Sequence, residues 1–345
     1  MNAMLGLLLL MLAATSAQPT PSAPPPSAMP SPWVFALDGS VGAQITSTGV
    51  SVASVATGPD GGGARANYTL DGGRLQTALL PSSPLGPSTC TPSGGGTVVA
   101  AANGSVSLAQ LWACAAPHPA SNAMVDLVVT VTDVFSPADE AIDITTTINV
   151  DRADVPFTAG LGLTLAPAGA TQFWTPWAKG CVQNNGRSHG MCFAPNKPWS
   201  EPFSAEPLST ATVASYRYGG GGTNDTFSLP IVSLLDATKD AALSLALSPE
   251  DTQLELNLEV QNGGASFVRD LHRLGQGREV VLHSHLLGHA ACFRPGLGFL
   301  TRRFADYFEP WVEDAADFEG TASYSWYQGP YNVTRAKSLG FKTNW

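Results

Sequence analysis

The chain has 345 residues, of which 44% are hydrophobic and only 13% charged, and its formal net charge is −10. This length allows one large domain or two of ordinary size with a sizeable core. The negative charge argues against binding to a nucleic acid backbone, which needs clustered Lys and Arg. The 35 Gly and 27 Pro residues favour strands and loops over helices, and the sequence has no glycine-rich phosphate-binding motif.

The N-terminus has the layout of a secretory signal peptide. An apolar run over 5–12 is followed by small residues, so residues 1–17 are predicted to be cleaved and the protein to be secreted. The run is shorter than the roughly 20 residues that span a bilayer. The sequence departs from the signal-peptide pattern in that no Lys or Arg precedes the run, and a short membrane anchor is the alternative. Residues 18–32 form a linker rich in Pro and Ser.

Secretion agrees with the sequons and the cysteines. Four N-glycosylation acceptors are predicted, at Asn67, Asn103, Asn224 and Asn332. Five cysteines should pair in an oxidising compartment. We pair Cys181 with Cys192, because they bracket a loop. Cys90 is paired with Cys114, because they flank a Gly-rich turn and an apolar run. Cys292 then remains, either lacking a partner in this chain or buried as a free thiol.

Strand patterns dominate the next part of the chain. In 142–150, Ile and Val residues alternate with Asp, Thr and Asn, so that one face is apolar and the other polar. The strand candidates are 126–135, 142–150, 242–248, 253–261 and 279–287. Because Gly, Pro and Asn turns separate such strands, the sequence predicts a large antiparallel β-sandwich over 33–265.

Helical spacing follows the strand patterns. Residues 266–275 form a short helix candidate and 296–310 a longer one, which Pro310 ends. We predict a helical linker over 266–318. The remainder, 319–345, is predicted to form a strand, a short helix with Asn332 as its N-cap, and a second strand.

This order of elements resembles the N-terminal part of multidomain glycoside hydrolases of the broad α-galactosidase and α-glucosidase kind. The stretches that carry the resemblance are "CFRPGLGFLTRRFADYFEPW", "GTASYSWYQGPYN" and "AKSLGFKTNW". In those enzymes a β-sandwich of the supersandwich, galactose-mutarotase-like type precedes a (β/α)8 barrel. The resemblance implies that 319–345 begins a truncated barrel, that the catalytic carboxylates lie beyond Trp345, and that this chain alone is inactive. Catalytic residues are therefore unassigned.

Side chains that suit a sugar gather in two places. The loop 172–199 is rich in Trp, and indole faces suit the C–H faces of a pyranose ring. The chain end places further aromatic residues at strand ends, which line the substrate site in complete barrels. The candidate carbohydrate-binding residues are Trp174, Trp177, Arg187, Trp199, Tyr324, Trp326, Asn344 and Trp345. The alternative is that these residues cap the sandwich or form barrel core.

The sequence gives weaker evidence for a metal site or for catalytic acidic residues. His283, His285 and His289 have a spacing that can bind zinc, but an exposed strand face is the alternative, and we predict no metal and no cofactor. The acidic stretch 309–319 is interpreted as a solvated linker. The predicted partner is a carbohydrate, with no nucleic acid and no membrane contact beyond the signal peptide. A non-catalytic secreted glycoprotein, binding carbohydrate or a protein through the Trp-rich loop, is the alternative function.

Overall fold

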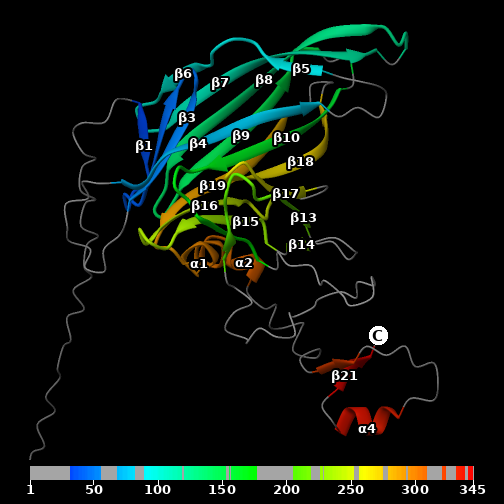
Figure 1. The fold of residues 1–345 in the computed structure, drawn as a ribbon. Helices are drawn as coiled ribbons and strands as arrows, with labels where there is room; N and C mark the ends of the chain where they lie inside the picture. The colour runs from blue at the N-terminus through cyan, green and yellow to red at the C-terminus, as the bar shows by residue number, and fades with distance from the viewer. Residues whose placement is uncertain are drawn as a thin grey trace, which may run out of the picture.

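The computed structural model describes residues 32–55, 68–81, 89–118, 120–152, 155, 157–176, 205–218, 226–227, 229–251, 256–274, 279–292, 294–308, 321–323, 332–338 and 341–344. Most of these residues lie in two large sheets that face each other (Figure 1). Their strands are antiparallel, apart from one short parallel pair at the edge of the first sheet. The prediction of a mainly β, sandwich-like fold is confirmed.

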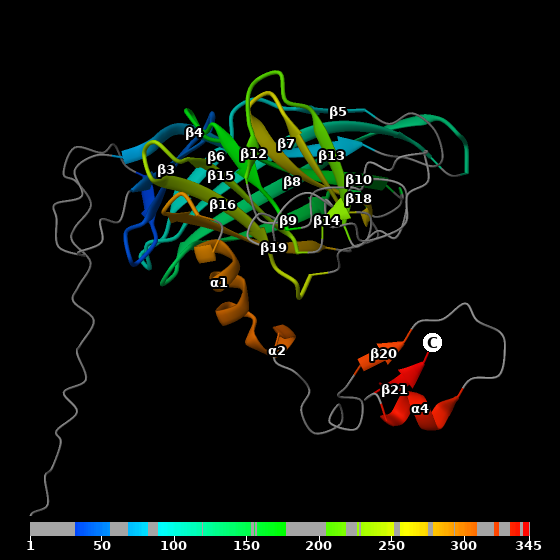
Figure 2. The same cartoon turned by 60° about the horizontal axis from the view of Figure 1, so that its bottom comes forward.

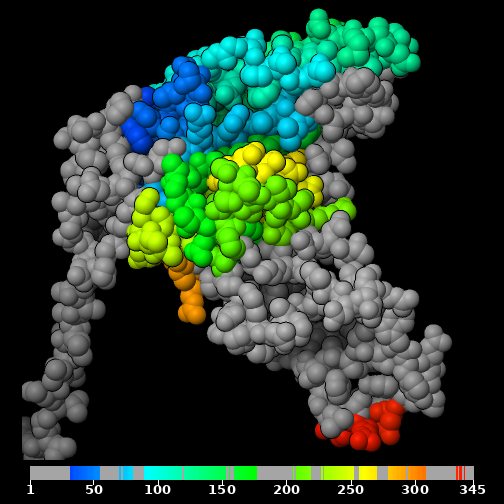
Figure 3. Space-filling model, viewed as in Figure 1, coloured from blue at the N-terminus to red at the C-terminus, as the bar shows by residue number. Residues whose placement is uncertain are grey.

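Sheet A contains nine strands among the described residues. In spatial order they are β1 (Trp33–Phe35), β2 (Val41–Thr46), β3 (Gly49–Val55), β4 (Tyr68–Pro81), β10 (Phe157–Ala166), β18 (Gly264–Leu274), β17 (Leu256–Gln261), β13 (Ala214–Tyr218) and β14 (Thr226–Phe227). Figure 3 shows the first strands, in blue, on the same face as strands in green and yellow from the second half of the chain. Both halves of the chain therefore build sheet A.

Sheet B contains ten strands in the described part of the chain. In spatial order they are β12 (Glu206–Pro207), β11 (Gln172–Trp174), β15 (Ile231–Asp236), β16 (Ala241–Leu247), β19 (Val280–His289), β9 (Ile142–Val150), β8 (Met124–Pro137), β7 (Val106–Pro117) and β5 (Thr89–Pro92), with β6 (Thr97–Ala100) also pairing with β7. In β9 the Ile residues point into the core and the Thr and Asn residues largely point away, as the alternation predicts. The core therefore lies between the inner faces of sheets A and B.

The helix predicted over 266–275 is wrong. These residues belong to β18, which pairs with β10 on one side and β17 on the other. Pairing on both edges satisfies the backbone of a central strand and overrides a side-chain spacing that also fits a helix. Strands β18 and β19 are integral to the two sheets, so the sandwich runs to His289 instead of ending at 265.

The second predicted helix is present and covers the outer face of sheet B. It forms α1 (Arg294–Arg303) and a short continuation, α2 (Ala305–Phe308). Figure 2 shows α1 beneath the strands of sheet B, and it contacts β15, β16 and β19. Every residue of β16 is therefore buried, contrary to the expectation of one wet face. No helix in the described ranges has the length and apolar character needed to span a bilayer.

A small unit follows near the end of the chain. Strands β20 (Thr321–Ser323) and β21 (Phe341–Asn344) pair in parallel, and α4 (Val333–Ser338) lies between them in sequence. The backbone N–H of Arg335 donates to Asn332 Oδ1 at 2.9 Å, as expected for an N-cap. The predicted strand–helix–strand order is confirmed, and its membership of a barrel stays a prediction.

Candidate functional site

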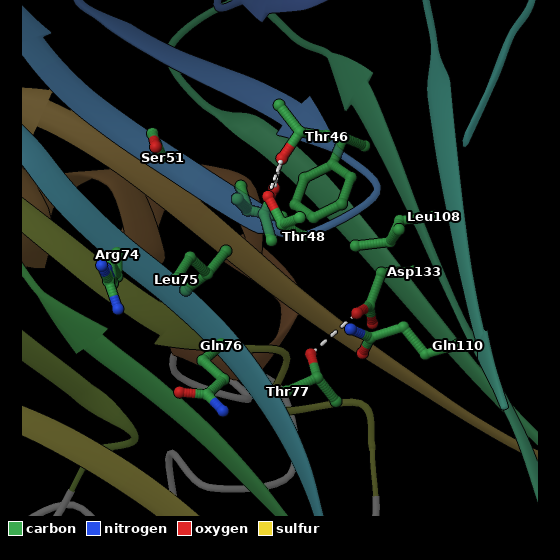
Figure 4. A pocket seen from close by; sticks show the side chains of 13 residues that line it. Thr46, Thr48, Ser51, Arg74, Leu75, Gln76, Thr77, Leu108, Gln110 and Asp133 are labelled. Carbon is green, nitrogen blue, oxygen red and sulfur yellow. Dashed lines mark hydrogen bonds between the residues drawn. The ribbon is translucent and has the colours of Figure 1, made fainter. Parts of the chain in front are cut away.

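A cavity of about 350 Å3 lies between the two sheets (Figure 4). It sits at a step in sheet A, where the ladder between β3 and β4 stops at Leu75 but β4 continues to Pro81, paired there with β10. The turn joining β2 to β3 forms one wall, with Thr46 Oγ1 and Thr48 Oγ1 3.0 Å apart. Strands β7 and β8 of sheet B form the opposite wall.

Most of the side chains that line this cavity are polar. They are Thr46, Thr48, Ser51, Arg74, Gln76, Thr77, Gln110 and Asp133. Figure 4 shows Thr77, Gln110 and Asp133 converging from β4, β7 and β8. Arg74 and Gln76 are exposed and alternate along β4 with the buried Leu75 and Thr77, so their side chains point to the other face of the strand (Figure 4). The cavity therefore offers hydroxyl, amide and carboxyl groups to a ligand.

Asp133 lies at the buried end of the cavity and is only 3% exposed. Thr77 Oγ1 donates to Asp133 Oδ2 at 2.7 Å, and Thr146 Oγ1 donates to Oδ1 at 2.6 Å. Burial raises the pKa of the Asp133 carboxyl, and these two hydrogen bonds lower it in part. A carboxyl group in such a place can accept hydrogen bonds from a ligand, or donate one when protonated.

Asp133 belongs to a polar layer that divides the core. On β8, for example, Asp133 stands between Val131 in one hydrophobic cluster and Phe135 in another. The polar layer consists of Thr77 on β4, Gln110 on β7, Asp133 on β8, Thr146 on β9 and Ser284 on β19. Burying polar groups costs free energy unless they are hydrogen-bonded, so a group of polar residues from five strands at one level of the core needs a reason.

A buried ion pair lies close to this layer. Arg269 Nη1 is 3.1 Å from Asp251 Oδ2, and both side chains are under 10% exposed. Burial lowers the pKa of the Arg269 guanidinium, while the charge of Asp251 and the hydrogen bond oppose that shift. Among the described residues, Arg269 Nη2 has no partner, and it lies beside a cavity of about 20 Å3 that Thr146 and Ser284 also line. This volume accommodates about one water molecule.

The three histidines of β19 have separate partners instead of converging. His283 Nδ1 is 2.9 Å from Asp251 Oδ1, and His285 Nδ1 is 2.7 Å from Asp143 Oδ1. His289 Nδ1 is 2.8 Å from the carbonyl oxygen of Ala290. Among the described residues, no group of three or more His, Cys, Asp or Glu side chains is arranged to hold a metal ion.

The imidazole of His289 is tied to the sheet beneath α1. Because the Ala290 carbonyl only accepts, His289 Nδ1 carries the proton and Nε2 accepts from Ser244 Oγ, 2.6 Å away. Ser244 Oγ is in turn 2.6 Å from Ser233 Oγ. Burial lowers the pKa of the His289 imidazole. Helix α1 covers this serine–histidine network, since a Cβ on Gly296 would lie 3.2 Å from Ser244 Oγ and 3.5 Å from His289 Nε2.

Only part of the predicted carbohydrate-binding set can be placed. Trp174 is 3% exposed and packs in the cluster formed with α1, as the alternative of a core-capping role expects. For Asn344 the structure describes the backbone alone, in β21. The residues that lie outside the described ranges are Trp177, Arg187, Trp199, Tyr324, Trp326, Trp345, Cys181, Cys192, Asn67 and Asn224.

The remaining cysteine and sequon predictions fall on described residues. Cys90 and Cys114 form the predicted disulfide, between opposing positions on β5 and β7. Cys292 is a free, half-buried thiol. Asn103 lies in an exposed turn, and its Oδ1 accepts hydrogen bonds from Ser105 N and Oγ at 3.1 and 2.6 Å. Glycosylation at Asn103 stays a prediction.

The sequence contains one signal that points to the cavity. In 126–135 the inward positions are apolar except at Asp133, where a charged residue interrupts the alternation. The sequence does not show that Thr77, which is 56 residues away, lies opposite this carboxyl. The cavity residues Thr77, Gln110 and Asp133 were therefore absent from the predicted set.

Comparison with known proteins gives no match to a family model and none to a curated protein. Among solved structures, the chain is similar to a galactose mutarotase-like protein from Clostridium acetobutylicum, with 10% identity and a TM-score of 0.34 over 72% of this chain and 95% of that one. It is also similar to two glycoside hydrolases. A family 97 enzyme from Pseudoalteromonas sp. strain K8, solved with panose, has 11% identity and a TM-score of 0.34 over 74% of this chain and 35% of that one.

The second hydrolase is a protein of family 38 from Enterococcus faecalis. It has 11% identity and a TM-score of 0.35, over 78% of this chain and 30% of that one. The chain thus spans about a third of the length of each hydrolase. None of these proteins shares enough sequence with this chain to transfer a site residue.

Proposed function

We propose that this chain is the N-terminal β-sandwich portion of a secreted, carbohydrate-active protein of the glycoside hydrolase class. The observation that carries the proposal is the order of the elements. A two-sheet sandwich ends at His289, α1 packs on its outer face, and a parallel β20–α4–β21 unit follows. This is the order expected where a sandwich precedes a (β/α)8 barrel, whose parallel strands are joined by helices.

In this proposal the catalytic carboxylates belong to the strands of a barrel and not to the sandwich. Glycoside hydrolysis needs two carboxyl groups placed across the scissile bond, and barrel enzymes hold them at the carboxyl ends of several strands. A single pair of parallel strands cannot close a barrel. The chain alone should therefore bind carbohydrate without hydrolysing it.

Secretion forms part of the proposal, and the disulfide supports it. The Cys90–Cys114 bond joins neighbouring strands, and such bonds persist in oxidising compartments. Expression in a eukaryotic secretory host should yield a product that lacks about 17 residues and loses mass on deglycosylation. Retention in the cytosol as an unprocessed, unglycosylated chain would contradict this part.

Turnover of aryl α- and β-glycosides by the purified chain tests where the chemistry resides. We expect no turnover above that of a buffer control. If robust turnover were found, and if substitution of a single Asp or Glu within the chain abolished it, the active site would lie in the sandwich and the proposal would be wrong. Asp133→Asn is the first such variant to examine, because Asp133 is the buried carboxyl beside the large cavity.

A further inference from the structure

The cavity between the sheets has the size and position of a small-molecule site. Its volume of about 350 Å3 falls within the roughly 300–1,000 Å3 of typical ligand pockets. Exposed residues stand at its mouth, and Asp133 lies at its buried end. Two rigid sheets form its walls, which favours a preformed site over one that assembles on binding.

Burying the polar layer costs free energy that an apolar layer would not cost, so its presence indicates a function. Val is close in size to Thr, so an apolar layer at Thr77 and Thr146 would fill the same space without burying hydroxyl groups. The two hydroxyls instead hold the carboxyl of Asp133 from opposite sheets, at 2.7 and 2.6 Å. Each oxygen of a carboxylate can accept more than one hydrogen bond. Asp133 therefore retains hydrogen-bonding capacity beside the cavity.

The charges around the cavity select against ionic ligands. A carboxyl at the buried end does not attract a phosphate or carboxylate ligand when it is neutral, and it repels such a ligand when it is ionised. Burial raises the pKa of Asp133 and so favours its neutral form, which weakens the attraction for an amine. Thr77, Gln110 and Thr46 are neutral and include both donors and acceptors. The cationic Arg74 is exposed and alternates along β4 with the buried Leu75 and Thr77, so its side chain points away from the buried end. A ligand that matches them carries several hydroxyl groups and no charge.

We propose that this cavity binds one neutral polyhydroxylated molecule of monosaccharide size, with Asp133, Thr77 and Gln110 contacting its hydroxyl groups. This inference rests on the proposed carbohydrate-related function and assigns it a site in the interior of the sandwich. The Trp-rich loop and the barrel end are not needed for this binding. The mouth at the step beyond β3 provides the entry path.

Calorimetric titration of the full chain with a panel of neutral monosaccharides and myo-inositol tests the site. Wild type is expected to bind at least one of them. Thr77→Val and Asp133→Asn should each weaken that binding at least tenfold, since each removes a group that contacts the ligand. Thr132→Val is the matched control, because Thr132 is next to Asp133 on β8 but points to the opposite face. It should leave the affinity unchanged.

A third cavity variant distinguishes the loss of a ligand contact from misfolding. Gln110 is half-buried beside the cavity, so Gln110→Met should fold normally and still weaken binding. If a neutral sugar bound wild type and all three cavity variants equally, the cavity proposal would be overturned while the carbohydrate-related function stood. Binding of amines or phosphate in place of polyols would also overturn it. If no saccharide bound anywhere on the chain, both proposals would fall.

Discussion

At the scale of single residues, the carboxyl of Asp133 makes the stability of the fold depend on pH. Burial raises its pKa above the value of about 3.9 in an unfolded chain. The folded state then binds this proton more tightly than the unfolded state. The stabilising contribution is complete below pH about 4 and is lost as pH rises through the folded-state pKa.

Asp133→Asn removes this titration while keeping the shape of the side chain. We expect the free energy of unfolding of the variant to rise relative to wild type as pH increases from about 4 toward neutrality. Urea denaturation at a series of pH values measures the difference. If the variant instead lost stability relative to wild type with increasing pH, Asp133 would be stabilised as a carboxylate, and its neutral form could not be part of the site.

The cavity shows how far single residues can be predicted from sequence. Asp133 interrupts an apolar alternation and could have been singled out for that reason alone. Its partner Thr77 comes from the other sheet, and Thr146 comes from the neighbouring strand. Such pairing depends on long-range register, which one sequence does not specify. The cavity therefore could not be predicted from the sequence alone.

At the scale of elements, substitution of Gly by Ala is expected to have opposite effects on stability at two positions of α1, Gly296 and Gly298. A Cβ on Gly296 would lie 3.0 Å from Ile231 Cδ1 and 3.2 Å from Ser244 Oγ, both in the sheet below. A Cβ on Gly298 would meet only the flexible end of Arg302. In a helix, Gly→Ala normally stabilises by up to about 1 kcal/mol.

Gly298→Ala should follow that rule, whereas Gly296→Ala should destabilise the protein by about 1–3 kcal/mol, because overpacking moves α1 off the sheet. Denaturant unfolding of the two variants measures both effects in one helix. Equal stabilisation by both would mean that α1 does not rest directly on the serine–histidine network.

Individual strands differ in how well the sequence predicts them. Strand β9 coincides with the predicted 142–150, because its outer face stays polar and the alternation is complete. Strand β16 was also predicted, as 242–248, but it is buried on both faces, so the expected polar face is absent. In β18, the residues Phe267, Leu271 and Leu274 fall at helical spacing, while pairing with β10 and β17 determines the conformation. Burial on both sides thus removes the signal that exposed strands carry.

At the scale of the whole molecule, the disulfide is expected to stabilise the sandwich in an oxidising compartment. Cys90 and Cys114 are separated by 24 residues, and a bond closing a loop of this size contributes about 2–4 kcal/mol. Adding a thiol reductant should lower the melting temperature of wild type. The double variant Cys90→Ala/Cys114→Ala should melt at the lower temperature with or without reductant.

Cys292→Ser serves as the control for this measurement, because Cys292 is a free thiol. Its response to reductant should equal that of wild type. A double variant that still lost stability on reduction would point to another bond, such as the predicted Cys181–Cys192 pair, as the stabilising one.

The central claim is that the sandwich belongs to a carbohydrate-active protein. Saturation-transfer NMR on the purified full chain, across neutral mono- and oligosaccharides, tests it most directly, because the method detects weak binding without any need for catalysis. The account predicts transfer to the ring protons of at least one saccharide, and none to an uncharged amide of similar size. Absence of transfer to every saccharide at millimolar concentration, from a chain shown to be folded, would contradict it.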